Sequence, residues 1–251
     1  MYLRGKRGQV TLFVIIAIII LAAIAIIAFS YPKIKPLISR TTPQVEIESC
    51  VQKAVADAVA KLGSSGFTPK IENTFPYQGN NLPYLCYTSE NYKTCTAQVG
   101  VLKTEAETAL AEAIKPAVSK CHAQARVASR NTQVEEKPFA LSITPNNIEV
   151  KLNSVFTLTQ GDAKQTVSGL NVKVASGVYN LLFIAQDIIN LEARYGDAFA
   201  EGYLREFPHI KVQKLDQGEG STIFILTDTT TGEQTLFAVR SRVFPPGYGY
   251  S

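Results

Sequence analysis

The chain has 251 residues, of which 46% are hydrophobic, and a formal net charge of +4. Three of its 25 basic residues lie in the first nine positions, so the rest of the chain carries 22 basic against 21 acidic residues and is nearly neutral. This balance excludes a basic stripe of the kind that neutralises nucleic-acid phosphates, and we expect no nucleic-acid partner. The length suffices for one large domain or two small ones.

An apolar block occupies residues 10–29, with Thr11 as its only polar member. A helix of twenty residues spans about 30 Å, the thickness of the hydrocarbon layer of a bilayer. The block is longer than the apolar region of an ordinary secretory signal peptide, and no small-residue cleavage pattern follows it. We therefore predict a single-pass transmembrane helix at residues 10–29. The alternatives are a cleaved signal peptide and a buried core helix.

The sequence on either side of this block predicts its orientation. The leader, residues 1–9, contains Arg4, Lys6 and Arg7 and no acidic residue. Because cationic flanks stay in the cytoplasm, we expect a cytoplasmic N-terminus and residues 30–251 outside the cell membrane. Residues 30–44 contain three prolines, which lack the N–H group that a helix interior needs. They predict a linker after the membrane helix.

Two amphipathic helices are predicted in the next region, residues 45–130. The first covers residues 45–62 and ends at a Gly-Ser turn. The second begins near Thr104, where Thr104 and Glu107 fit a capping box, and its apolar face continues to Ala125. Between them, residues 67–98 are rich in Pro, Asn, Gly and Tyr. They predict a long loop or an irregular hairpin.

All four cysteines lie in this region, on the side predicted to face away from the cytoplasm. An even number of cysteines in an oxidising compartment indicates two disulfides. Cys50 and Cys121 lie on or beside the apolar faces of the two predicted helices. This placement favours a Cys50–Cys121 bridge that encloses a Cys86–Cys95 bridge. Four buried free thiols are the alternative.

After a polar stretch near residues 130–138, which predicts a hinge, the hydrophobic period changes to two. Three or four antiparallel strands are expected between residues 139 and 174, a helix over 178–194, and a shorter helix or turn over 195–207. Further strands are expected at 210–214, 221–226 and 234–240. The predicted fold class is α+β, with a disulfide-stapled helical region and, over residues 139–243, an antiparallel sheet packed with a helix. Residues 244–251 form a tail of Pro, Gly and Tyr.

No catalytic motif and no metal-binding spacing is found in the sequence. Cys121 and His122 are neighbours, but adjacent helical positions point about 100° apart. We expect no catalytic residue, no metal ligand and no cofactor. Acidic residues around the third predicted helix are interpreted as a charged outer face, with a carboxylate pair for acid–base chemistry as the alternative: Asp187, Glu192, Asp197 and Glu201.

Tyrosines are concentrated in the irregular segment around the predicted short disulfide. An exposed tyrosine offers a large, rigid contact area at low entropic cost, as in many binding surfaces. The alternative, which we favour slightly, is that they fill a small core beneath the loop. The residues of this candidate contact surface are Tyr77, Tyr84, Tyr87 and Tyr92.

Residues 6–13 read KRGQVTLF. This stretch resembles the class III signal of archaeal type IV pilin-like proteins, in which a dedicated peptidase cleaves between a basic, glycine-containing leader and a glutamine. The resemblance implies cleavage between Gly8 and Gln9 and self-assembly through residues 10–29. Two departures argue against ordinary filament assembly: Phe13 stands where the family usually carries an acidic residue, and prolines interrupt the helix that pilins extend into the head. The layout of the whole chain resembles uncharacterised single-pass surface proteins of small-genome archaea, a likeness that implies no activity.

The sequence therefore favours a non-catalytic, membrane-anchored protein that serves cell-surface contact or envelope structure, with protein partners or copies of itself. A pilin-like filament subunit, processed between Gly8 and Gln9, is the first alternative. A membrane-anchored enzyme of unknown reaction is the second.

Overall fold

The computed structural model describes residues 16, 18–21, 43–128, 132–160 and 163–243. The chain divides into two units, Met1–Val45 and Glu46–Ser251. In the first unit, residues 16 and 18–21 are helical and exposed. No helix within the described ranges is long and apolar enough to cross a membrane. Most of the predicted membrane helix, the leader and nearly all of the predicted linker lie outside the described residues, so these predictions stay untested.

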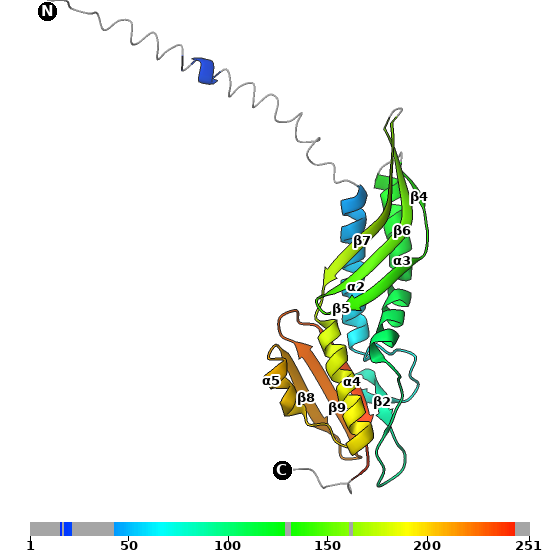
Figure 1. Ribbon diagram of the computed structural model, residues 1–251, viewed down its shortest axis with the longest axis vertical. Coiled ribbons are helices and arrows are strands. Elements are labelled where there is room, and N and C mark those ends of the chain that lie inside the picture. Colours follow the sequence, from blue (N-terminus) through cyan, green and yellow to red (C-terminus); the bar gives the residue numbers. More distant parts are fainter. Residues whose placement is uncertain (1–15, 17, 22–42, 129–131, 161–162, 244–251) are drawn as a thin grey trace, which may run out of the picture. The chain divides into compact units, whose positions relative to one another are not determined.

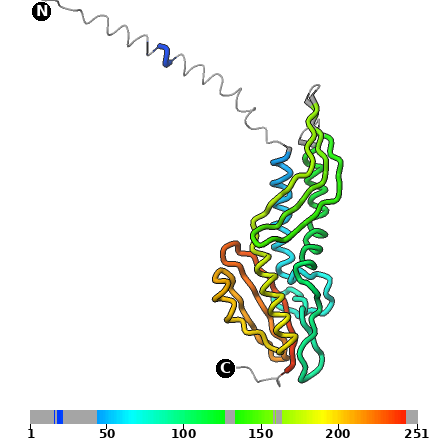
Figure 2. Tube along the Cα trace, viewed as in Figure 1, coloured from blue at the N-terminus to red at the C-terminus, as the bar shows by residue number. Residues whose placement is uncertain are grey.

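The Glu46–Ser251 unit has an α+β fold, which confirms the predicted class (Figure 1). Figure 2 follows the chain by colour from α2 in blue to β10 near the red end of the bar. In chain order the elements are α2 (Pro43–Gly63), β1 (Thr74–Tyr77), β2 (Asn80–Tyr87), β3 (Thr96–Ala97), α3 (Leu102–Ala128), β4 (Thr132–Glu135), β5 (Phe139–Thr144), β6 (Asn147–Gln160), β7 (Ala163–Ala175), α4 (Val178–Tyr195), η1 (Ala200–Gly202), α5 (Tyr203–Glu206), β8 (Ile210–Asp216), β9 (Ser221–Asp228) and β10 (Gln234–Arg240).

The helices α2 and α3 follow the predicted amphipathic pattern, but the start of α3 differs from the prediction. The helix begins at Leu102, whose N–H donates to Oε1 of Gln186 on α4 at 2.7 Å. The side chain of Glu107 pairs with the Lys103 ammonium at 2.6 Å and accepts the N–H of Ile143 at 2.8 Å, and makes no hydrogen bond to the backbone of Thr104. The predicted capping box at Thr104 is therefore wrong, because partners from distant segments take its place.

The first sheet is built around the long strand β6. It pairs antiparallel with β5 and then β4 along one edge, and with β7 along the other. The register shifts between Leu152 and Val155, so β6 contains a bulge near Asn153. Strand β4 occupies part of the predicted hinge. Alternate residues of β6, including Ile148 and Val150, are buried in the core.

The second sheet has the strand order β1-β2-β10-β9-β8 among the described residues, and β3 pairs with β2. Helix α4 packs on one face of it, against β2, β9 and β10 (Figure 1). Strand β2 runs parallel to β10, so the sheet is mixed and not purely antiparallel as predicted. The sequence also predicted one sheet where the structure has two. Strands β1 and β2 pair antiparallel as a hairpin, which was one of the two alternatives predicted for residues 67–98. The sequence did not show the place of β2 in the second sheet, because five successive residues of β2 are buried and one of them is Pro83, which hides the alternation of a half-buried strand.

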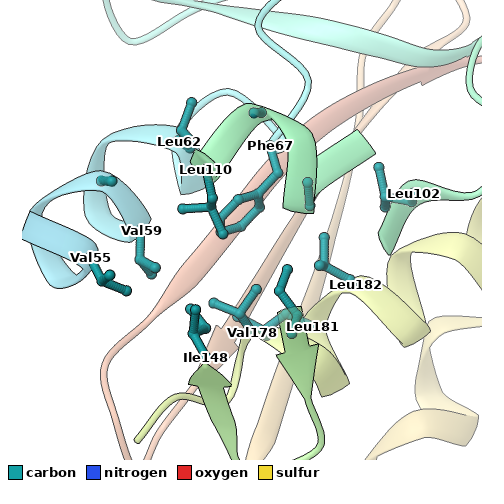
Figure 3. Packing of buried hydrophobic residues seen from close by; sticks show 14 of the residues in the cluster. Val55, Val59, Leu62, Phe67, Leu102, Leu110, Ile148, Val178, Leu181 and Leu182 are labelled. Atoms are coloured by element: carbon teal, nitrogen blue, oxygen red, sulfur yellow. The ribbon is translucent and has the colours of Figure 1, made fainter. Parts of the chain in front are cut away.

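One continuous core connects the three long helices with both sheets. Figure 3 shows side chains from α2, α3 and α4 converging with Ile148 of β6 and with Phe67, which follows α2. Gly63 lies so close to β10 that a Cβ atom there would stand 2.1 Å from the carbonyl oxygen of Gln234. This contact fixes the end of α2 against the second sheet.

Candidate contact surface

All four cysteines of the chain form disulfides, Cys50–Cys121 and Cys86–Cys95. The Cα atoms are 5.8 Å apart in the first bridge and 5.3 Å apart in the second. This pairing is the one that the sequence favoured. The long bridge joins α2 to α3, and the short bridge closes a loop, residues 86–95, which we call the disulfide loop.

The disulfide loop is attached to the end of β10 and to the residues that follow it. The N–H of Thr88 donates to the carbonyl of Arg240 at 3.0 Å, and the N–H of Arg242 donates to the carbonyl of Lys93 at 3.1 Å. The Arg242 guanidinium also donates to Oδ1 of Asn91 at 2.9 Å. A bridge at its base and contacts along its length therefore hold the loop in one conformation.

Tyr92 protrudes from this loop. Its side chain is 73% exposed, and its backbone has φ = +60°, in the left-handed region that few residues other than glycine adopt. A tyrosine held in that conformation by a tethered loop is presented to solvent before any partner arrives. It is the most exposed aromatic side chain of the described residues.

The other three tyrosines gather on the face of the second sheet opposite α4. In β10 the side chains of Phe237 and Val239 enter the main core beneath α4, whereas Leu236 and Ala238 point to the other face. There they join a separate cluster, which we call the outer-face cluster. Its buried members are Leu82, Tyr84, Ile223 and Ala238, and its half-buried members are Phe75, Tyr77, Tyr87, Leu215, Ile225 and Leu236.

Tyr84 fills the centre of the outer-face cluster. Its ring meets that of Tyr87 edge-on at 5.1 Å between centroids, and its Oη lies 2.8 Å from Oγ of Ser221, within hydrogen-bond distance. Burial raises the pKa of Tyr84 above its ordinary value. Tyr84 is thus a core residue, as the alternative interpretation of the tyrosines proposed, whereas Tyr77 and Tyr87 lie at the rim and Tyr92 is not part of the cluster.

Arg240 completes the rim of the cluster. Its guanidinium lies 5.6 Å from the centre of the Tyr87 ring and donates to Tyr87 Oη at 3.1 Å. The same group lies 3.8 Å from a carboxylate oxygen of Glu219. Sequence reasoning missed this residue, since nothing local in the sequence of β10 indicates that it meets β2.

The acidic residues around α4 have different environments. Glu192 is only 3% exposed, so the predicted charged outer face is wrong for this residue. Its Oε1 accepts the N–H of Ala198 at 3.1 Å, and burial, aided by the charge of Asp197, raises its pKa to about 7. Asp187 accepts the hydroxyl of Tyr203 at 2.6 Å, Asp197 pairs with Lys214, and Glu201 is exposed.

Two carboxylates, Asp228 at the end of β9 and Glu233 in the turn before β10, approach the N-terminus of α4, which has no acidic residue in its first turn. Glu233 accepts the N–H of Gly177 at 2.6 Å. Asp228 is buried, and burial opposes its ionisation, but hydrogen bonds from Thr230 and Thr231 outweigh this effect and hold the pKa of Asp228 below its ordinary value. Both carboxylates complement the positive end of the helix dipole, a role that only the folded chain reveals.

His122 lies on the buried face of α3, one position after the long disulfide. Its Nδ1 stands 3.7 Å from a carboxylate oxygen of Glu136, and neither ring nitrogen has a hydrogen-bond partner among the described residues. Burial lowers the pKa of His122, although the neighbouring Glu136 opposes the shift. Glu136 itself accepts from Ser119 at 2.9 Å and from Arg126 at 2.8 Å.

Comparison with known protein families, with curated proteins and with solved structures finds no similar protein. The possible processing site, Gly8 and Gln9, lies outside the described residues.

Proposed function

We propose that this chain is a non-catalytic protein anchored in the cell membrane by residues 10–29, with residues 30–251 outside the cytoplasm, where they serve cell-surface contact or envelope structure. The observation that carries this proposal is the pairing of all four cysteines in two disulfides. Such bonds form and persist in oxidising compartments outside the cytoplasm. The basic leader and the long apolar block in the sequence support the anchor and its orientation.

The disulfide loop is the proposed contact site, with Tyr92 at its centre. Tyrosine and arginine are enriched among the residues that dominate binding energy in protein interfaces. A loop that is already ordered loses less conformational entropy when it binds, which favours affinity. The rim formed by Tyr77, Tyr87 and Arg240 offers a second surface of similar composition.

Photo-cross-linking in intact cells tests the contact site. A photoreactive amino acid at position 92 should yield a defined cross-linked adduct. The same amino acid at position 195 is the control, because Tyr195 is also exposed, at 57%, but lies at the end of α4 and not in the disulfide loop. Equal labelling from both positions, or none from position 92, would contradict the proposal.

The pilin-like alternative depends on the KRGQVTLF stretch and predicts a mature protein that begins at Gln9. N-terminal sequencing of protein purified from native membranes distinguishes the two. An N-terminus at Gln9 supports processing. Protease added outside the cell shows which molecules have been exported, because it digests their ectodomain. If these exported molecules still begin at Met1, processing between Gly8 and Gln9 is excluded. Cleavage immediately after residue 29 would overturn the anchored protein and the filament subunit alike.

A further inference from the structure

The neighbourhood of Glu192 contains the three groups that an intramolecular cross-link requires. We propose that the Lys214 side chain and the Asp197 side chain are joined by an isopeptide bond that forms within the folded chain, with Glu192 as the proton-transfer residue. This proposal is independent of the proposed function.

The fold brings the two side chains into contact. Lys214 lies in β8, and its Nζ contacts Oδ1 of Asp197. Helix α4 ends at Gly196 in the left-handed conformation, with φ = +77°, and this sharp turn directs Asp197 towards β8. The amine and the carboxyl group are therefore held together by the chain before any reaction, which replaces a bimolecular encounter.

Glu192 is linked to the same place through Ala198. The N–H of this buried residue donates to the Glu192 carboxylate at 3.1 Å, and its carbonyl oxygen lies 3.5 Å from Nζ of Lys214. Because burial raises the pKa of Glu192 to about 7, near neutrality the group can both release and accept a proton. The charges of Lys214 and Asp197 act on it in opposite directions.

The reaction is a condensation that needs no oxidant and no co-reactant. The ammonium group of Lys214 first gives a proton to the Asp197 carboxylate, which leaves a neutral amine and a carboxylic acid. The amine then attacks Cγ of Asp197 and forms the C–N bond. The C–O bond to the hydroxyl breaks, Glu192 protonates the departing oxygen so that it leaves as water, and the surplus proton on the new amide nitrogen passes to Glu192.

The position of the bond fits the distribution of cross-links in the chain. No cysteine occurs after Cys121, so no disulfide can secure the strands that follow. Strand β8 is at the edge of the sheet order and pairs with β9. A bond between residues 197 and 214 would tie this edge strand to the end of α4. The Lys214 and Asp197 side chains are 25% and 41% exposed, so the released water can leave.

Mass spectrometry of the full-length protein, purified from membranes in detergent and reduced, tests the bond. Digestion with trypsin should give one branched peptide in which residues 195–205 are joined to residues 212–240, uncleaved after Lys214 and lighter by one water than the sum of its two parts. Three separate peptides, residues 195–205, 212–214 and 215–240, obtained from the folded wild-type protein would show an ordinary ion pair only and overturn the proposal.

Variants distinguish the loss of the isopeptide bond from a loss of the folded structure. Lys214→Arg should abolish the branched peptide and lower the Tm by about 6–12 °C, whereas Lys211→Arg on the same strand should change neither. Glu192→Gln keeps an acceptor for the Ala198 N–H and should reduce the cross-linked fraction after refolding at least about tenfold. Circular dichroism and intact disulfides establish that each variant is folded. Wild-type cross-linking in Glu192→Gln would exclude the role assigned to this residue.

Discussion

At the scale of single residues, His122 makes the stability of the protein sensitive to acid. Its pKa is lower in the folded chain than the ordinary value of about 6.5 that it has when unfolded, because burial disfavours the charged ring. As the pH falls through 6.5, the unfolded chain therefore binds a proton before the folded chain does. The stability that the neutral ring provides is present above pH 6.5 and is lost as the pH falls through the folded pKa.

We expect His122→Leu to flatten the decline of the free energy of unfolding between pH 7 and pH 5. At pH 7.5 the variant should stay within about 1 kcal/mol of wild type, because it also removes two buried nitrogens without partners. Urea denaturation at a series of pH values measures both the decline of the free energy of unfolding with pH and its value at pH 7.5. Ser119→Ala, which removes only a hydrogen bond to Glu136, is the control and should retain the wild-type slope. If the free energy of unfolding of His122→Leu declined as steeply with pH as that of wild type, His122 would not be the cause of the acid sensitivity.

Gly177 gives a second prediction at this scale. A Cβ atom there would lie 2.0 Å from Oδ2 of Asp228, whose other oxygen is held by Thr230 and Thr231. Gly177→Ala should therefore lower the free energy of unfolding by about 1–3 kcal/mol. Gly202→Ala is the matched control, since its Cβ would meet nothing within 4 Å and its φ of −61° suits alanine. The control should be neutral or stabilising by up to about 1 kcal/mol in urea denaturation.

At the scale of elements, the two disulfides should contribute unequally. In the chain-entropy model, the Cys50–Cys121 bridge, which spans 71 residues, stabilises by about 4 kcal/mol, and the Cys86–Cys95 bridge, which spans 9, by about 2.5 kcal/mol. The double variant Cys50→Ala, Cys121→Ala should accordingly melt at a lower temperature than Cys86→Ala, Cys95→Ala. Calorimetry on the two purified variants gives the order, and the reverse order would show that contacts of the disulfide loop outweigh chain entropy.

The sequence predicts the elements of this fold better than their partners. The ranges of α2, α4 and β10 follow from hydrophobic periodicity alone, and the cysteine pairing follows from the faces of two helices. The pairing of β2 with β10 in one sheet cannot be predicted in this way, because strand pairing depends on contacts between residues far apart in the sequence. For the same reason the sequence could not separate buried Tyr84 from exposed Tyr92.

Glu192 is the exception, since its burial could have been predicted. It follows Ile188 by four positions on α4 and so lies on the stripe that the sequence already marks as apolar. A carboxylate on an apolar stripe indicates burial and therefore a shifted pKa, which the predicted charged outer face did not take into account.

At the scale of the whole Glu46–Ser251 unit, the second sheet depends on the last strand. A chain truncated after residue 232 lacks β10, which lies between β2 and β9 in the sheet order. We expect this chain to be degraded by protease under conditions in which a chain truncated after residue 243 resists. Limited proteolysis of both, followed by mass spectrometry, makes the comparison. Equal resistance would mean that β2 and β9 hold their places without β10.

The parallel pairing of β2 with β10 also has a consequence for the time course of folding. In sequence, 153 residues separate Tyr87 from Arg240, yet their side chains are hydrogen-bonded. Contacts between such distant residues form slowly, because a long loop must close before they are gained. A nascent chain cannot complete this sheet until β10 has been synthesised. The second sheet is therefore the last part of this unit that can be completed, and if the chain crosses a membrane, that sheet can close only on the side to which residues 234–240 have been delivered.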